Sequence, residues 1–101
     1  NKCLFVTIMN QEKLKLARKK VDLLDKKIFD LIKKRTQVVN YMLSLKKFKK
    51  QIVDYKRIDK ILKNIKKKSI KKKLDIKLTR SIWSNMIKAY IDFEYRKFKK
   101  K

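Results

Sequence analysis

The sequence predicts an all-α fold, and three observations carry that prediction. The chain of 101 residues contains no glycine and no proline, the residues on which tight turns and sheet connections most depend. Apolar residues recur every three or four positions over residues 14–47, which is the spacing of one helix face. Two later segments, residues 54–65 and 75–93, show the same spacing. We therefore expect three helices in the order long, short, long.

The first predicted helix, residues 11–47, is too long to be covered by the other two. Residues 14–47 alone extend roughly 50 Å at about 1.5 Å per residue, so an intertwined homodimer is the economical way to cover the far half. Asn10 is the expected N-cap of this helix. Residues 1–9 are then an N-terminal extension, and residues 10–101 form one helical domain.

Two aspartates mark where the other helices are expected to begin. Asp54 is the predicted N-cap of the second helix, with Arg57 one turn later as an ion-pair partner, and Asp75 is the predicted N-cap of the third. The lysine run at residues 66–73 repels itself and has little to bury, so we expect it to fray or to form an exposed connection. Residues 96–101 are expected to form a loose tail.

The charge of the chain is strongly unbalanced. The formal net charge is +24, from 33 basic and 9 acidic residues, and such an excess normally suggests a polyanionic partner. Only five of the 33 are arginine, and the lysines surround all three predicted helices. We interpret the excess as a compositional bias, so nucleic acid is a disfavoured partner. A basic bundle that binds nucleic acid, mainly through residues 66–73, and a purely structural helical dimer remain alternative functions.

The scarcity of cysteine and histidine excludes several classes of enzyme. Cys3 is the only cysteine and there is no histidine, so an intrachain disulfide, a histidine metal site and a catalytic triad are not expected. The apolar run at residues 4–9 is too short for a membrane span or a signal segment. We expect a cytoplasmic protein without a metal or a cofactor.

Two cations interrupt the apolar side of the long predicted helix. Arg35 stands where the spacing calls for another leucine, and Lys46 lies eleven residues later. On a helix this places Lys46 about 20° further round the axis and about 16 Å along it. Cations on a buried side need an anion, and arginine binds carboxylates with two parallel hydrogen bonds. We therefore expect a site for a small carboxylate ligand.

The order and spacing of these and other residues resemble the all-helical class of chorismate mutases over about residues 14–95. The matching features are residues 16–25 with Arg18, then Arg35, Lys46, the pair Asp54 and Arg57, the pair Ile82 and Trp83, and Glu94. The resemblance implies an isomerase that converts chorismate to prephenate in aromatic amino-acid biosynthesis. It also implies a homodimer with two sites, each built from both chains, and no cofactor.

The family pattern gives each of these residues an expected role. Arg18, Arg35 and Arg57 would hold the carboxylates, with Asp54 beside Arg57. Arg18 lies about 25 Å from Arg35 along one helix, too far to share one small ligand within a chain. The resemblance implies that Arg18 comes from the partner protomer, which removes that difficulty.

Two further residues would act on the bond that breaks. Lys46 would stabilise the negative charge that develops on the ether oxygen as the C–O bond breaks. Glu94 would donate a hydrogen bond there only when protonated, so activity is expected to fall as the pH rises and Glu94 ionises.

Two positions depart from the family pattern. Ile58 stands where many members have a glutamate that bonds the substrate hydroxyl, and Tyr90 stands where a serine often contacts a carboxylate. Each lost hydrogen bond costs about 1–2 kcal/mol, so we expect weaker binding or turnover. The departures also leave open a related lyase acting on isochorismate, or a member without activity.

Overall fold

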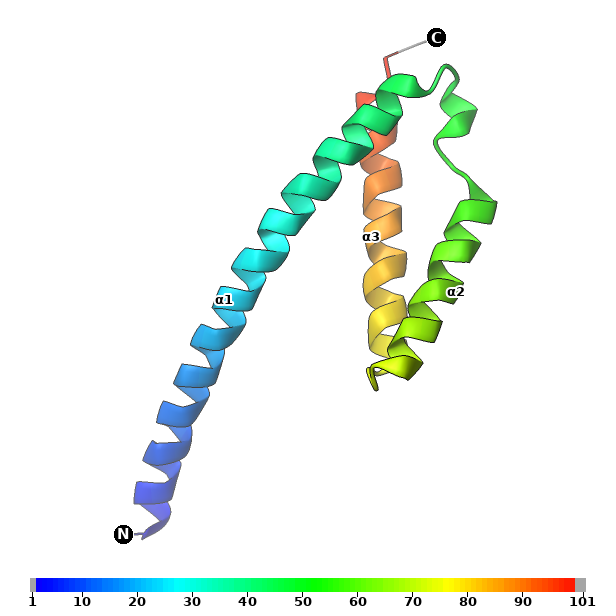
Figure 1. Cartoon of the computed structure of the whole chain (residues 1–101). Coiled ribbons are helices and arrows are strands. Elements are labelled where there is room, and N and C mark those ends of the chain that lie inside the picture. The colour runs from blue at the N-terminus through cyan, green and yellow to red at the C-terminus, as the bar shows by residue number, and fades with distance from the viewer. Residues whose placement is uncertain (1, 100–101) are drawn as a thin grey trace. The chain divides into compact units, whose positions relative to one another are not determined.

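The structure, a computed structural model, describes residues 2–99, and within them every regular element is a helix (Figure 1). Helix α1 spans Lys2–Leu45, a short 3-10 turn η1 spans Lys49–Gln51, α2 spans Tyr55–Lys71 and α3 spans Ile76–Lys97. The all-α class and the three predicted helices are confirmed. The chain divides into two units, Asn1–Val39 and Asn40–Lys101.

The described part of the first unit is one uninterrupted stretch of α1. The whole helix has 44 residues, which is about 65 Å at 1.5 Å per residue. Its apolar stripe, including Leu24 and Ile28, is exposed. The predicted N-cap at Asn10 is wrong, because α1 already begins at Lys2. No residue before Asn10 breaks a helix, and adding a turn to an existing helix needs no new nucleation. The domain boundary at residue 10 stays a prediction.

The second unit contains an antiparallel hairpin of α2 and α3 (Figure 1). Each helix turns an apolar stripe of half-buried side chains inward: Ile58, Ile61, Leu62 and Ile65 from α2, and Trp83, Met86, Ile87, Tyr90 and Phe93 from α3. Leu43 and Ile52 are the buried hydrophobic residues of the described chain. The core is therefore small.

Both predicted N-caps of the hairpin are confirmed. The Oδ1 atom of Asp54 accepts a hydrogen bond from the backbone N–H of Arg57 at 3.0 Å. Asp75 Oδ1 accepts one from the backbone N–H of Leu78 at 2.8 Å. Such caps satisfy backbone donors that have no partner within the helix, and each stabilises a helix by about 1 kcal/mol.

The lysine run does not fray as predicted, because its first six residues, 66–71, form the last turns of α2. Ser69 interrupts the run and is only 2% exposed. Its Oγ donates to Ile65 O at 2.6 Å and lies 2.7 Å from Thr79 Oγ1 of α3. This contact anchors the segment, while the lysines around it stay exposed. Cations at the end of a helix also interact favourably with the helix dipole.

The turn between α2 and α3 is closed without glycine. Lys73 has a φ of 57°, in the left-handed region. The backbone N–H of Leu74 donates to Ser69 O at 2.9 Å, and that of Lys73 donates to Ile70 O at 3.3 Å. This pair of bonds is the Schellman arrangement that ends many helices.

The predicted loose tail is wrong for its first two residues, because α3 continues through Lys97. Phe98 ends the helix by donating its backbone N–H to Glu94 O at 2.9 Å. Residues 100 and 101 of that predicted tail lie outside the described residues. Within residues 2–99, no helix combines the length and apolar character needed to cross a membrane.

Candidate functional site

An ion pair between Lys46 and Glu94 is the centre of the candidate site. Lys46 directly follows the last residue of α1, and Glu94 lies three residues before the last residue of α3. The Nζ atom of Lys46 donates to Glu94 Oε1 at 2.9 Å. The structure thus brings together two predicted catalytic residues that are 48 positions apart in the sequence.

This ion pair is largely shielded from solvent. The side chains of Lys46 and Glu94 are 19% and 11% exposed. Tyr90, one turn before Glu94, is half-buried, and its ring meets that of Phe93 edge to face at 6.3 Å between centroids. In such surroundings electrostatic interactions are stronger than in water. The arrangement can present a cationic donor and a carboxyl group to one small ligand.

The local chain path explains how Lys46 is held. Its backbone N–H donates to Leu43 O at 3.1 Å, and Leu43 is buried. On the far side of Lys46, the side-chain Oε1 of Gln51 accepts from the backbone N–H groups of Lys47 and Phe48, at 2.7 and 2.8 Å. These bonds hold the connection that follows α1 and so position the backbone of Lys46.

The structure places the predicted residues of α2 at the beginning of that helix. The carboxylate of Asp54 bonds the backbone of Arg57, so the expected ion pair between these two residues is replaced by a cap. The Arg57 side chain is exposed, and it forms no ion pair with any described residue. Ile58 is half-buried.

The two remaining predicted arginines lie on the part of α1 that belongs to the first unit. Arg18 is exposed and Arg35 is half-buried. Seventeen residues separate them on a continuous helix, which is about 25 Å at 1.5 Å per residue. One small ligand cannot contact both arginines of the same chain.

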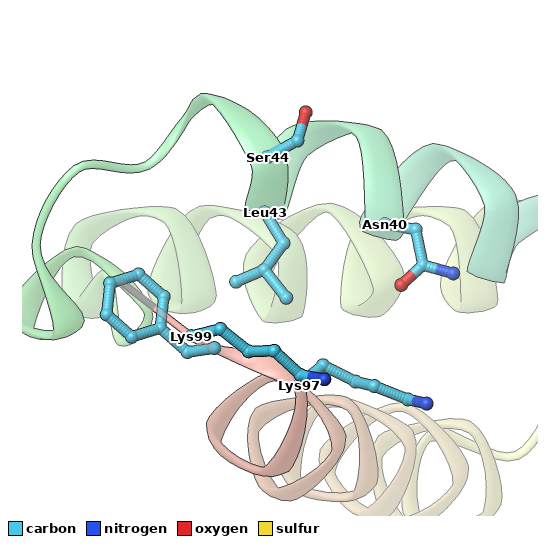
Figure 2. A pocket seen from close by; sticks show the side chains of 6 residues that line it. Asn40, Leu43, Ser44, Lys97 and Lys99 are labelled. Carbon is cyan, nitrogen blue, oxygen red and sulfur yellow. The ribbon is translucent and has the colours of Figure 1, made fainter. Parts of the chain in front are cut away.

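An open pocket of about 310 Å³ lies between the end of α1 and the end of α3 (Figure 2). It is lined by Asn40, Leu43, Ser44, Lys97, Phe98 and Lys99. The sequence analysis missed this pocket, because it treated residues 96–101 as a loose tail. The apolar residue Phe98, which stands between lysines in the sequence, was the one signal that could have indicated this pocket. Among residues 2–99, no group of three or more His, Cys, Asp or Glu side chains could hold a metal ion.

Comparison with known protein families identifies a family for most of the chain. The model of the family described as chorismate mutase type II matches residues 17–95. The matched range begins within α1, includes all of α2 and ends two residues before the end of α3. It contains Arg18, Arg35, Lys46 and Glu94. Comparisons with curated proteins and with solved structures found no match. Because the family model covers most of its length, the chain belongs to the chorismate mutase type II family.

Proposed function

We propose that this protein converts chorismate to prephenate as a cytoplasmic isomerase of aromatic amino-acid biosynthesis. The observation that carries the proposal is the shielded ion pair of Lys46 and Glu94 in a chain of this family. The reaction is an intramolecular rearrangement: one ether C–O bond breaks while one C–C bond forms in the same molecule. It needs no nucleophile, metal or cofactor, so a site of cationic groups and one acid is chemically sufficient.

In the proposed mechanism, Lys46 acts on the bond that breaks. Negative charge develops on the ether oxygen as its bond to carbon lengthens, and an ammonium already held in place stabilises that charge more than it stabilises the ground state. Glu94 orients Lys46 through the 2.9 Å bond. In its protonated form Glu94 donates a second hydrogen bond to the same oxygen.

The arginines are proposed to hold the substrate in its reactive conformation. Chorismate carries two carboxylates, and guanidinium groups fix the orientation of a carboxylate as well as its charge. Arg35 and Arg57 would act from one protomer and Arg18 from its partner. Holding the reacting carbon atoms close together removes part of the entropic barrier.

A homodimer is part of this proposal. The exposed apolar stripe of α1 supports it, because a helix of this length with such a stripe is normally covered by another element. The distance between Arg18 and Arg35 on α1 gives a second reason, since a partner protomer can bring its own Arg18 to the site. Each of the two sites would then draw residues from both chains.

The departures at Ile58 and Tyr90 limit the expected efficiency. Ile58 offers no hydrogen bond to a substrate hydroxyl, so binding or turnover is expected to be roughly tenfold weaker per missing bond. The same cationic site could instead catalyse a related lyase reaction, the release of pyruvate from isochorismate.

The test is an assay of chorismate consumption and prephenate formation with purified protein. Lys46→Gln is expected to lower kcat by about 100-fold or more, the usual cost of removing a donor from a developing oxyanion. Lys47→Gln is the matched control, because it removes the same charge from the next, exposed residue, and it should leave kcat unchanged. Absence of turnover by the unmodified protein, or equal losses in both variants, would contradict the proposal. Pyruvate release from isochorismate would identify the lyase instead.

A further inference from the structure

We propose that one end of the second unit, where α1 and α3 finish, binds single-stranded nucleic acid. We call this surface the basic-aromatic end; it consists of Lys47, Phe48, Lys49, Lys50, Tyr95, Lys97 and Lys99. None of these residues belongs to the proposed catalytic site, so this inference does not depend on the chorismate reaction.

Lysines and aromatic rings are in contact with one another on this surface. Lys49 Nζ lies 5.7 Å from the centroid of the Tyr95 ring, although the two residues are 46 positions apart. Lys50 Nζ lies 5.7 Å from the centroid of the Phe48 ring. The connection after α1 and the last turn of α3 therefore form one continuous surface in which cations and rings are neighbours.

The rings remain available to a ligand, and none of the lysines on this surface forms an ion pair with a described residue. Phe48 is 55% exposed and Tyr95 is 40% exposed. Residues 46–53 and 95–99 contain no aspartate or glutamate. Glu94, which immediately precedes Tyr95, is buried and paired with Lys46. Proteins that bind single strands combine a basic surface for the phosphates with exposed rings on which the bases stack.

The pocket described above adjoins this surface (Figure 2). Leu43 and Phe98 give it an apolar lining, while Lys97 and Lys99 supply positive charge beside it. Asn40 points toward the pocket from α1, and its amide can both donate to and accept from the edge of a base. Its volume of about 310 Å³ is at the lower limit for small-ligand pockets. An unstacked base fits this combination better than a paired one, because only an unpaired base can leave its strand at low cost.

A lysine-rich surface on α2 differs from the basic-aromatic end because it has no aromatic ring among its lysines. Lys60, Lys67 and Lys71 lie on α2 and are exposed. From Lys56 to Lys71, however, α2 contains no aromatic residue. These lysines can attract any polyanion but offer no ring for stacking, so they provide a control of matched charge.

The experiment measures the binding of a fluorescein-labelled oligothymidylate of about 12 nucleotides to the full chain by anisotropy, at several salt concentrations. Lys49→Gln, Lys50→Gln and Lys97→Gln are combined in one variant. Each phosphate contact on a single strand contributes about 0.7 to the slope of log K against log salt. We expect this variant to reduce the slope by about two units, whereas the combined Lys60→Gln, Lys67→Gln and Lys71→Gln variant leaves it unchanged.

A second pair of variants tests the rings. Phe48→Leu combined with Tyr95→Leu should weaken single-strand binding about fivefold or more, since stacking is sensitive to loss of the ring. Phe29→Leu, which removes an exposed ring from the first unit, should have no effect. The charge-preserving variant Lys49→Arg, Lys50→Arg and Lys97→Arg should retain the original slope.

Two results would overturn the inference. Equal reductions of the slope in the two Lys→Gln variants would mean that the positive charge acts uniformly. The other result has two parts: the Phe48→Leu, Tyr95→Leu variant binds the single strand as tightly as the unmodified protein does, and a duplex of the same length is bound at least as tightly as the single strand. It would mean that the rings play no part.

Discussion

Helix α3 makes one shielded polar contact near each end, and the two contacts have nearly the same length. At its beginning, Thr79 Oγ1 lies 2.7 Å from Ser69 Oγ. At its end, Glu94 Oε1 accepts from Lys46 Nζ at 2.9 Å. Both join α3 to another part of the second unit. The first is neutral and the second is charged, and this difference separates a structural contact from a chemical one.

The hydroxyl groups of the neutral contact bond to each other and to nearby backbone carbonyls. Ser69 Oγ also bonds Ile65 O, and Thr79 Oγ1 lies 3.2 Å from the carbonyl oxygens of Asp75 and Ile76. A hydroxyl has only one hydrogen to donate. If Ser69 Oγ donates to Ile65 O, Thr79 Oγ1 donates to Ser69 Oγ, and both hydroxyl hydrogens are then used. The charged contact is different, because an ammonium has three N–H groups and a carboxylate accepts several hydrogen bonds. Such a pair can exchange partners with an incoming anion.

The largest expected effect concerns Glu94. Glu94→Ala removes the group that orients Lys46, and we predict a fall in kcat of about 100-fold, comparable to the loss of a transition-state donor. Glu94→Gln keeps the shape of the side chain and an oxygen that can accept from Lys46. We therefore predict that Glu94→Gln retains much more of kcat than Glu94→Ala. Steady-state kinetics of chorismate turnover is the measurement.

The neighbouring acid provides the control for that prediction. Asp92 is exposed on the same helix, two residues earlier, and Asp92→Ala should leave kcat unchanged. An unaltered kcat in Glu94→Ala would remove Glu94 from the proposed role.

The next effect concerns the neutral contact and is predicted to change stability without changing chemistry. Ser69→Ala removes one partner, but Thr79 keeps carbonyl acceptors. The free energy of unfolding should fall by about 1 kcal/mol, the net value of one hydrogen bond. Chemical denaturation of Ser69→Ala, Thr79→Val and the double variant gives the coupling energy directly.

A coupling near zero would show that the two hydroxyls act independently. Ser81→Ala, at an exposed position of α3, is the control and should change the unfolding free energy by no more than about 0.5 kcal/mol. If Ser69→Ala lowered kcat as strongly as Glu94→Ala, the distinction between the two contacts would fail.

The sequence predicted most of the helical framework, because the signals for it are local. Asp54 and Asp75 were correctly predicted as N-caps, since the side chain and the backbone donor it bonds are three residues apart. Asn10 misled the prediction, because a residue suited to a cap does not stop a helix that can continue through it. The lysine run misled it as well. The burial of Ser69 against Thr79 is a tertiary contact that charge patterning does not reveal.

The candidate site was predicted only in part, for a similar reason. Periodicity located Lys46, but its contact with Glu94 joins residues 48 positions apart, and only the family resemblance indicated it. The pocket beside Phe98 depends on how the last turn of α1 meets the end of α3. No local sequence pattern encodes this packing. The proposed contribution of Arg18 from a partner protomer stays a prediction.

The turn beside the neutral contact offers a stabilising change. Lys73 adopts a left-handed φ of 57°, which costs a residue with a Cβ atom about 1 kcal/mol or more relative to glycine at that position. Lys73→Gly should therefore raise the free energy of unfolding by about 1 kcal/mol, less the backbone entropy that glycine loses on folding. Thermal unfolding followed by circular dichroism measures the change. Lys72→Gly, one residue earlier at a φ of −96°, should destabilise the protein instead.

The smallest effect is expected at an exposed ion pair on α2. Lys63 Nζ lies 3.0 Å from Asp59 Oδ2, one turn apart on α2, and their side chains are 71% and 66% exposed. Water and salt screen such a pair, and ordering two long side chains offsets much of the attraction, so exposed pairs of this kind stabilise by no more than about 0.5 kcal/mol. Lys63→Gln should therefore change the unfolding free energy by less than that amount, and the difference should vanish at high salt. A larger loss that persists at high salt would show that distance alone, rather than burial, decides the strength of an ion pair here. The contrast with Lys46 and Glu94 would then need another explanation, because the two ion pairs differ in length by only 0.1 Å.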